Sequence, residues 1–286
     1  MNGILLVDKP QDWTSHDVVA KLRGVFGERR VGHSGTLDPL ATGLLVVFFG
    51  KATKAVEFSE AAEKEYLAHL RLGIETDTQD ITGTVLRTSS EIPDLAALES
   101  VLPRFCGEIQ QIPPMYSAIK VNGKKLYDIA RRGEEVERQP RVIFIRELSL
   151  LGEENGEFIL RVRCSKGTYI RTLCHDIGQM LGCGGVMTAL RRTCVGGYDV
   201  RAAHTVAALT ELERDEAESL LLPLDSVFSD LKAVTLSDLN EAHCRNGRPF
   251  SLQLPDGRYR VYGKDGQFLM VANVESEQVR ALKRFY

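Results

Sequence analysis

The feature that most constrains the fold is a glycine-rich segment that leads directly into an apolar one. Residues 30–43 read RVGHSGTLDPLATG, and residues 44–49 read LLVVFF. A short, continuous apolar run of this kind is typical of a buried central strand. The segment before it holds a single acid, Asp38, among glycines and hydroxyl side chains, and Pro39 biases Asp38 towards an extended backbone. We therefore expect Asp38 on an irregular loop, aimed by its backbone. Asp-Pro pairs are also common in plain surface turns, so the rest of the chain has to decide whether Asp38 does chemistry.

The composition is that of a globular protein without a membrane segment or a disulfide framework. The chain has 286 residues, of which 43% are hydrophobic and 26% charged, and this length is enough for one large domain or for one domain plus a small appendage. Residues 44–49 are too short to cross a bilayer, and residues 4–7 are too short for a signal peptide. We expect a cytoplasmic protein whose six cysteines are reduced, and no Cys/His spacing suggests a metal. The net charge of −3 disfavours a nonspecific nucleic-acid coat but allows a local basic surface.

Strand and helix patterns occur without a regular strand–helix–strand rhythm, which predicts an α+β fold rather than a doubly wound parallel sheet. Strands are predicted at 4–7, 44–49 and 158–164. Helices are predicted at 15–26 with Ser15 as N-cap, from Asp94 to Phe105 with an apolar stripe that includes Leu95, at 169–181 and at 208–222.

The pattern changes at about residue 232. Residues 258–262 and 268–274 flank the sequence GKDG, which is a hairpin signal. This part of the chain is therefore predicted to be a small β-rich domain.

Residues 113–141 combine cations with aromatic side chains. They hold seven Lys and Arg residues and four acids, a local charge of +3, together with Tyr116 and Tyr127. Basic side chains neutralise phosphates, and aromatic faces stack on exposed bases. A solvated amphipathic helix over 124–132, ended by Gly133, explains the same residues without any ligand.

A cation stands at an unusual place in the segment SKGTYIRTL, residues 165–173. Arg171 falls in the first turn of the predicted helix 169–181, where the helix already carries partial positive charge. Such a cation favours an anionic partner, for which a phosphate and the carboxylate of Asp38 are both candidates. An ordinary ion pair with a surface glutamate is the plainer alternative.

Seven separated blocks lie at residues 3–19, 30–45, 64–66, 77–83, 113–131, 165–173 and 190–196. Together they resemble the TruB family of tRNA pseudouridine synthases. They keep the family order, they span most of residues 3–197, and Ser34 keeps the hydroxyl where the family often has threonine. The resemblance implies the pseudouridine synthase fold, a mixed, largely antiparallel central sheet flanked by helices, over residues 1–228. It also implies a small PUA-like RNA-binding domain over 232–286, on a weaker match. The blocks are GILLVDKPQDWTSHDVV, RVGHSGTLDPLATGLL, KEY (64–66), DTQDITG (77–83), PPMYSAIKVNGKKLYDIAR, SKGTYIRTL and LRRTCVG.

The resemblance further implies that uridine 55 in the T-loop of tRNA is isomerised to pseudouridine without a cofactor. The N-glycosidic bond breaks, the uracil rotates, and C5 joins the ribose carbon. The stacked base must first be flipped into a pocket. Asp38 would attack uracil C6 or ribose C1′, or assist a glycal route, and the sequence leaves the choice open. Arg171 beside Asp38 would favour the ionised carboxylate.

The remaining roles also come from the resemblance. Tyr66 would stack on the uracil and move a proton, although a tyrosine in a strand is also an ordinary core residue. Tyr169 and Leu190 would line the same pocket, His33 would fill the gap left by the flipped nucleotide, and Lys9 would support Tyr66. The insertion 113–141 would close over the T-arm. We expect a monomer whose partner is tRNA, with no membrane and no small-molecule cofactor. Its RNA-contacting cations would be Lys120, Lys124, Lys125, Arg131 and Arg132.

Two other functions fit parts of the sequence. A glycoside hydrolase also breaks a glycosidic bond, but it needs a second carboxylate, and nothing pairs Glu65 or Asp77 with Asp38. A non-catalytic RNA-binding protein or RNA chaperone would use the same basic surface. T-arm RNA separates the first alternative from the synthase, because a hydrolase releases uracil and a synthase yields an isomer of unchanged mass.

Overall fold

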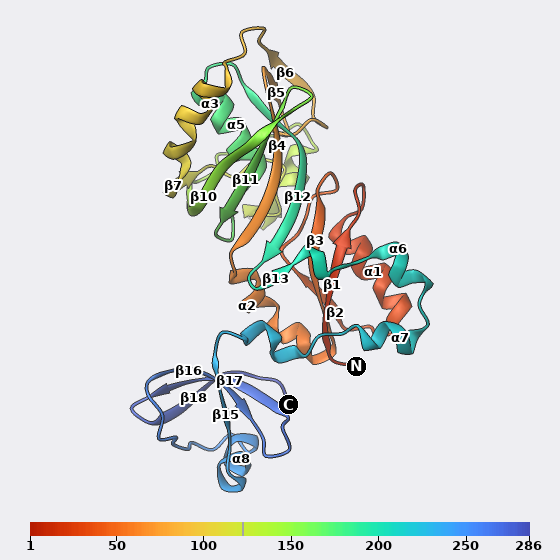
Figure 1. Ribbon diagram of the computed structural model, residues 1–286, viewed down its shortest axis with the longest axis vertical. Coiled ribbons are helices and arrows are strands. Elements are labelled where there is room, and N and C mark those ends of the chain that lie inside the picture. The colour runs from red at the N-terminus through yellow and green to blue at the C-terminus, as the bar shows by residue number, and fades with distance from the viewer. Residues whose placement is uncertain (122) are drawn as a thin grey trace.

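The computed structural model describes residues 1–121 and 123–286, and its central element is a ten-stranded mixed sheet (Figure 1). All neighbouring strands on its main path are antiparallel except the pairs β1–β14 and β3–β12. The prediction of a largely antiparallel central sheet is therefore confirmed. The path runs through β14 (His204–Thr205), β1 (Gly3–Lys9), β3 (Thr42–Phe49), β12 (Gly185–Val195), β4 (Lys64–Leu72), β11 (Glu157–Cys164), β10 (Arg141–Glu154) and β7 (Gly107–Gln111).

The sheet has two halves that meet at a short parallel pairing between β3 and β12. Only Thr42 and Gly43 pair there, with Arg191 and Arg192. Gly43 has a φ of +99°, and a Cβ at this position would lie against the backbone of Arg192. A glycine is therefore required where the two halves meet, and it is the last residue of the glycine-rich segment.

The first half consists of β1, β3 and the short β2 (Val31–Ser34), covered by helix α1 (Ser15–Phe26). The N-cap of α1 is Thr14, not Ser15 as predicted, because Thr14 forms a reciprocal capping box with Asp17. The predicted helix 208–222 is also wrong. It is two short helices, α6 (Val206–Glu211) and α7 (Arg214–Ser219), because Leu212 is extended and Glu213 starts a new capping box with Glu216.

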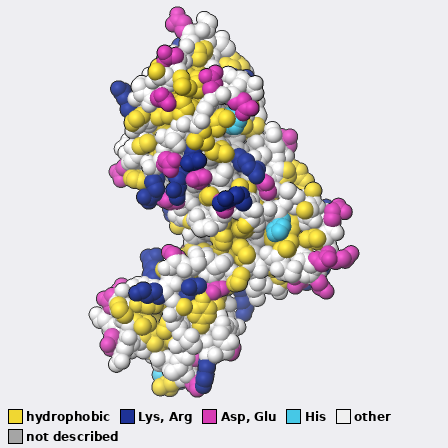
Figure 2. Space-filling model, in the orientation of Figure 1, with side chains coloured by type: hydrophobic (Ala, Val, Ile, Leu, Met, Phe, Trp, Pro, Cys, Tyr) yellow, Lys and Arg dark blue, Asp and Glu magenta, His cyan; other side chains and the backbone are white. Residues whose placement is uncertain are grey.

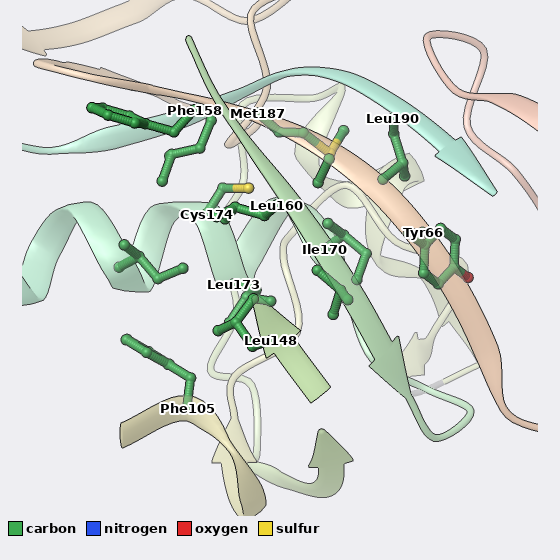
Figure 3. Close-up of a cluster of buried hydrophobic side chains, with 14 of the residues drawn as sticks. Tyr66, Phe105, Leu148, Phe158, Leu160, Ile170, Leu173, Cys174, Met187 and Leu190 are labelled. Carbon is green, nitrogen blue, oxygen red and sulfur yellow. The ribbon is translucent and has the colours of Figure 1, made fainter. Parts of the chain in front are cut away.

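The second half packs helix α5 (Ile170–Met180) and helix α3 (Leu95–Val101) on one face of β4, β10, β11 and β12. Figure 3 shows this apolar cluster, in which Ile170 and Leu173 of α5 lie beside Leu160 of β11. The predicted helix at 95–105 is α3 followed by a 3-10 turn (Leu102–Phe105), and Leu95 is exposed rather than part of the packed stripe.

The insertion 113–141, of which residue 122 lies outside the described residues, contains much less helix than predicted. Helix α4 covers only Leu126–Ala130, because Lys124–Lys125 (β9) pair with Lys120–Val121 (β8) in a small hairpin. Met115, Leu126 and Ile129 form a separate apolar cluster. The insertion therefore folds as a small unit of its own beside the sheet.

The C-terminal unit is a second sheet in the order β15-β16-β17-β18 with helix α8 (Asp238–Arg245), at the lower end of Figure 1. The predicted hairpin is confirmed as β16 and β17. Phe228 stacks near Phe268 and Phe285, so the unit shares an apolar contact with the first sheet. The strands are β15 (Lys232–Thr235), β16 (Gly257–Tyr262), β17 (Phe268–Glu275) and β18 (Gln278–Arg284).

The shorter elements connect these parts of the fold. No helix among the described residues is both long and apolar enough to span a membrane. The connecting elements are α2 (Val56–Ala61), β5 (Ile74–Thr76), β6 (Val85–Thr88), β13 (Tyr198–Asp199) and the 3-10 turns Gly50–Ala55, Val200–Ala202 and Leu224–Phe228.

Candidate active site

A pocket of about 1100 Å³ opens beside the junction of the two halves of the sheet. Four of its lining residues are the acid, the cation and the two tyrosines that the sequence indicated, namely Asp38, Arg171, Tyr66 and Tyr169. They come from the loop before β3, from β4 and from the start of α5, and the insertion 113–141 supplies a further wall. The structure therefore brings together residues that are up to 133 positions apart in the chain (171 minus 38).

Asp38 lies on an irregular loop, as predicted, and both of its neighbours are held by the segment that starts α1. Ser15 Oγ accepts a hydrogen bond from Leu37 N at 2.9 Å and donates one to Leu37 O at 3.2 Å. On the other side, the carbonyl of Pro39 accepts from Asp12 N at 2.8 Å. Because the main chain is fixed on both sides, the carboxylate is aimed without being buried, and its side chain remains 42% exposed.

Arg171 is the partner of Asp38. Its Nε lies 2.9 Å from Asp38 Oδ2, and the guanidinium is only 6% exposed. The other nitrogens donate to the carbonyls of Thr78 at 3.0 Å and Tyr116 at 2.8 Å, and Asp80 lies at 3.8 Å. One guanidinium therefore ties together the Asp38 loop, the loop 77–83 and the insertion.

The aromatic residues form the apolar part of the site. Tyr66 lies at one end of the core cluster, and its hydroxyl oxygen points away from the packed side chains (Figure 3). Burial raises the pKa of both Tyr66 and Tyr169, so each phenol stays neutral at physiological pH and can donate a hydrogen bond. Leu190 packs in the same cluster as Tyr66 but is not one of the residues that line the pocket.

Two buried cations at the pocket were missed by the sequence analysis. Arg192 is 1% exposed, and its guanidinium donates to Leu44 O at 2.7 Å and to Gly35 O at 3.0 Å. Lys64 donates to the carbonyls of Glu60 and Ala62, and burial lowers its pKa to about 8. Arg192 lies in the block LRRTCVG and Lys64 in the block KEY. Only the pairing of β12 with β4, which sets Arg192 opposite Tyr66, shows that the two blocks lie side by side.

Neither Lys9 nor His33 lines the pocket. Lys9 does not support Tyr66 through a hydrogen bond. Its ammonium donates to Trp13 O at 2.6 Å, Pro10 O at 2.8 Å and Pro39 O at 3.4 Å, so it holds the Asp38 loop instead. His33 lies on β2 outside the pocket lining, with its ring edge-on to His16 at 5.5 Å, and burial lowers its pKa to about 4.

The predicted RNA-contacting cations of the insertion differ in their contacts and in whether they line the pocket. Arg131 lines the pocket, and its guanidinium lies over the Tyr127 ring at 5.4 Å, while Lys125 donates to the Tyr127 hydroxyl at 2.9 Å. Lys120, Lys124 and Arg132 are exposed and lie outside the lining. Figure 2 shows Lys and Arg side chains gathered near the middle of the visible face.

The acids proposed for a hydrolase lie elsewhere. Glu65 accepts from Thr193 Oγ1, Asp77 accepts from Thr84 N, and neither lines the pocket. Asp80, whose Oδ2 lies 3.8 Å from Arg171, accepts hydrogen bonds from the hydroxyls of Thr78 and Thr82 through Oδ1. Within residues 1–121 and 123–286, no cluster of three His, Cys, Asp or Glu side chains is arranged to hold a metal.

Comparison with known proteins assigns the family. The model of the TruB family pseudouridylate synthase N-terminal domain matches residues 23–170, and that of the tRNA pseudouridylate synthase B C-terminal domain matches residues 171–229. The chain belongs to the TruB family. The junction between the two matched regions falls inside the first turn of α5, between Ile170 and Arg171, so each region contributes one member of the Asp38–Arg171 pair.

Relatives from the TruB family match along the whole chain. A protein named tRNA pseudouridine synthase B from Burkholderia mallei is 43% identical over 99% of this chain and 96% of its own length. A protein of the same name from Francisella philomiragia is 40% identical over 100% of this chain and 95% of its own. Among solved structures, a Cbf5-Nop10-Gar1 complex contains a chain with a TM-score of 0.75 and 25% identity, covering 99% of this chain and 85% of that one.

Proposed function

We propose that this protein converts uridine 55 in the T-loop of tRNA into pseudouridine, with Asp38 as the nucleophile. The observation that carries the proposal is the Asp38–Arg171 ion pair at 2.9 Å, on the wall of a pocket that Tyr66 and Tyr169 also line. The full-length relatives that are named tRNA pseudouridine synthase B support tRNA as the substrate. Because tRNA is the partner, the protein acts in the cytoplasm.

The reaction exchanges two bonds of one nucleotide. The bond from ribose C1′ to uracil N1 breaks, C1′ joins C5, the proton on C5 is lost, and N1 gains a proton. Atoms and electrons balance within the substrate and water, so no redox or group-transfer partner is needed. Asp38 attacks the flipped nucleotide because its carboxylate faces the pocket, where the Arg171 guanidinium lies 2.9 Å away and holds it in place.

The tyrosines supply the apolar part of this chemistry. The Tyr66 ring stacks on the uracil, and its neutral hydroxyl donates a hydrogen bond or a proton to the rotating base. Tyr169 covers the base from the start of α5. A pocket of about 1100 Å³ is much larger than one uracil, which leaves room for the ribose and flanking phosphates.

The rest of the tRNA contact is assigned by charge. Residues 1–228 form the catalytic part and residues 232–286 a PUA-like RNA-binding part. The insertion 113–141 closes over the T-arm, with Arg131 at the pocket and Lys120, Lys124, Lys125 and Arg132 towards the phosphates. His33 fills the gap that the flipped nucleotide leaves, since its low pKa keeps the ring neutral and able to stack. The protein acts as a monomer.

The decisive experiment replaces Asp38 by asparagine, which keeps the shape and removes the charge. A tRNA transcript labelled with tritium at C5 of uridine releases tritium only when C5 forms the new bond. We expect single-turnover release by the Asp38→Asn variant to fall at least about 10³-fold while tRNA binding changes little. Asp215→Asn, the same change on the surface of α7, is the control.

Three outcomes would contradict parts of the proposal. Release of free uracil by the wild-type protein would make it a hydrolase. Tight tRNA binding without tritium release by the wild-type protein would leave only an RNA-binding or chaperone function. Turnover by Asp38→Asn near the wild-type rate would exclude Asp38 as the nucleophile. A transcript with cytidine at position 55 tests the position in the same assay.

A further inference from the structure

Gln111, the last residue of β7, holds the start of the helix that carries Arg171. Its side chain is almost fully buried, with the residue 2% exposed. The amide oxygen Oε1 accepts from Tyr169 N at 2.8 Å, and the amide nitrogen Nε2 donates to Tyr169 O at 3.0 Å. The Gln111 side chain thus forms hydrogen bonds with both the N–H and the carbonyl of Tyr169, as a paired strand would.

Tyr169 is the residue at which a fixed main chain matters most. It is the N-cap of α5 with an extended backbone, and its own side chain makes no capping hydrogen bond. Its carbonyl also accepts the first helical bond, from Leu173 N at 3.0 Å. Arg171 follows two positions later, and its Nε must remain within about 3 Å of Asp38 Oδ2 to keep the ion pair. A tilt at Tyr169 therefore displaces both the tyrosine ring and the guanidinium.

Gln111 also lies where the insertion leaves the sheet. The insertion starts at residue 113, and the carbonyl of its Tyr116 accepts from Arg171 Nη2 at 2.8 Å. The start of α5 is thus tied at two points to the segment that leads from β7 into the insertion, by Gln111 on Tyr169 and by Arg171 on Tyr116. A movement of the insertion on closing over RNA would therefore also move the start of α5 and the guanidinium of Arg171.

We propose that Gln111 is a positioning residue for the isomerisation, which holds the main chain of Tyr169 and thereby aims Arg171 at Asp38. Gln111 does not line the pocket and touches no substrate, so it acts through Tyr169 alone. This inference rests on the proposed function, because the readout is conversion of uridine in tRNA. A residue that merely completes the core would affect folding without a selective effect on the chemical step.

The test uses two variants of Gln111 in the full-length protein. Gln111→Met keeps the length of the side chain and removes both hydrogen bonds. Gln111→Glu keeps the shape, but the ionised carboxylate accepts from Tyr169 N and cannot donate to Tyr169 O, whereas the protonated acid can do both. Gln110→Met is the matched control, because Gln110 is the neighbouring residue on β7 and its side chain is exposed.

We expect Gln111→Met to slow single-turnover tritium release by about 10- to 100-fold, with the tRNA dissociation constant within about threefold of wild type. Gln111→Glu should regain rate relative to wild type as the pH is lowered from about 8 to about 5.5, since protonation restores the missing donor. Gln110→Met should match wild type, and its activity shows that the proposed function itself holds.

Two results would overturn the proposal. One is a Gln111→Met rate within twofold of wild type in folded protein. The other is a Gln111→Glu pH profile parallel to that of wild type, which decides the matter even if the methionine variant does not fold. An inactive wild-type protein would instead refute the proposed function, which keeps the two failures apart.

Discussion

Replacing Ser15 by alanine removes a hydroxyl that does not line the pocket but forms two hydrogen bonds with the main chain of Leu37. Ser15 is fully buried and Leu37 is 3% exposed, so the N–H and carbonyl of Leu37 lose their partner in a place that water does not reach. An unsatisfied buried N–H costs about 1–3 kcal/mol, and the longer bond to the carbonyl adds less. We expect a total loss of about 2–4 kcal/mol in the free energy of unfolding.

The substitution should also slow the reaction. Leu37 precedes Asp38, and a displacement of about 1 Å at a reacting group can cost about 10²-fold in rate. Single-turnover tritium release by Ser15→Ala should therefore fall by about 10- to 100-fold at a temperature where the protein is folded. Urea unfolding gives the stability, and filter binding shows that tRNA affinity is retained.

A matched control separates the two effects. Thr205→Ala removes the N-cap hydroxyl of α6, which accepts from Ala208 N at 3.2 Å and does not line the pocket. It should lower stability by about 1 kcal/mol and leave the rate unchanged. If Ser15→Ala loses stability as calculated but converts tRNA at the wild-type rate, the hydroxyl does not position Asp38 and the reasoning fails.

Two further predictions concern charge. Arg171→Lys should slow conversion at least about 100-fold with little change in tRNA binding. The reason is that an ammonium cannot pair with Asp38 and also reach the carbonyls of Thr78 and Tyr116. A near-normal single-turnover rate would show that the planar guanidinium is not needed. The pKa of His33 is about 4 in the folded protein, so as the pH falls the unfolded chain takes up this proton before the folded protein does. The free energy of unfolding therefore decreases as the pH falls from about 6.5 towards 4, by about 3 kcal/mol at most. His33→Gln should flatten that part of the pH dependence in urea unfolding, and an unchanged slope would contradict the low pKa.

The sequence predicted those parts of the fold that depend on neighbouring residues. Periodicity identified the strands at 44–49 and 158–164 and the helices that became α1 and α5, since each pattern repeats within a few residues. The helix at 124–132 was wrong for the same reason, because its amphipathic pattern gives no sign that Lys124–Lys125 pair with Lys120–Val121.

The supports of the site could not be predicted, because they connect distant positions. Ser15 and Leu37 are 22 positions apart, Gln111 and Tyr169 are 58 apart, and Arg192 and Leu44 are 148 apart. Ser15 is typical of an N-cap, and only the tertiary fold shows that Thr14 takes that place and frees Ser15 for Leu37. Asp38 and Arg171 stood out locally as an isolated acid among glycines and a cation at a helix start, but their roles were predicted from the resemblance to the TruB family.

The buried cations at the pocket are solvated mainly by the main chain. Most of their hydrogen bonds go to main-chain carbonyls rather than to carboxylates, as in Arg192 to Leu44 and Gly35, and Lys64 to Glu60 and Ala62. Carbonyl dipoles solvate a buried cation without cancelling its charge, so the surrounding field stays positive. Under the proposed function, such a field would attract an RNA phosphate towards the pocket that holds Asp38. Carboxylates in place of those carbonyls would offset the positive charge of the cations and weaken the attraction for a phosphate.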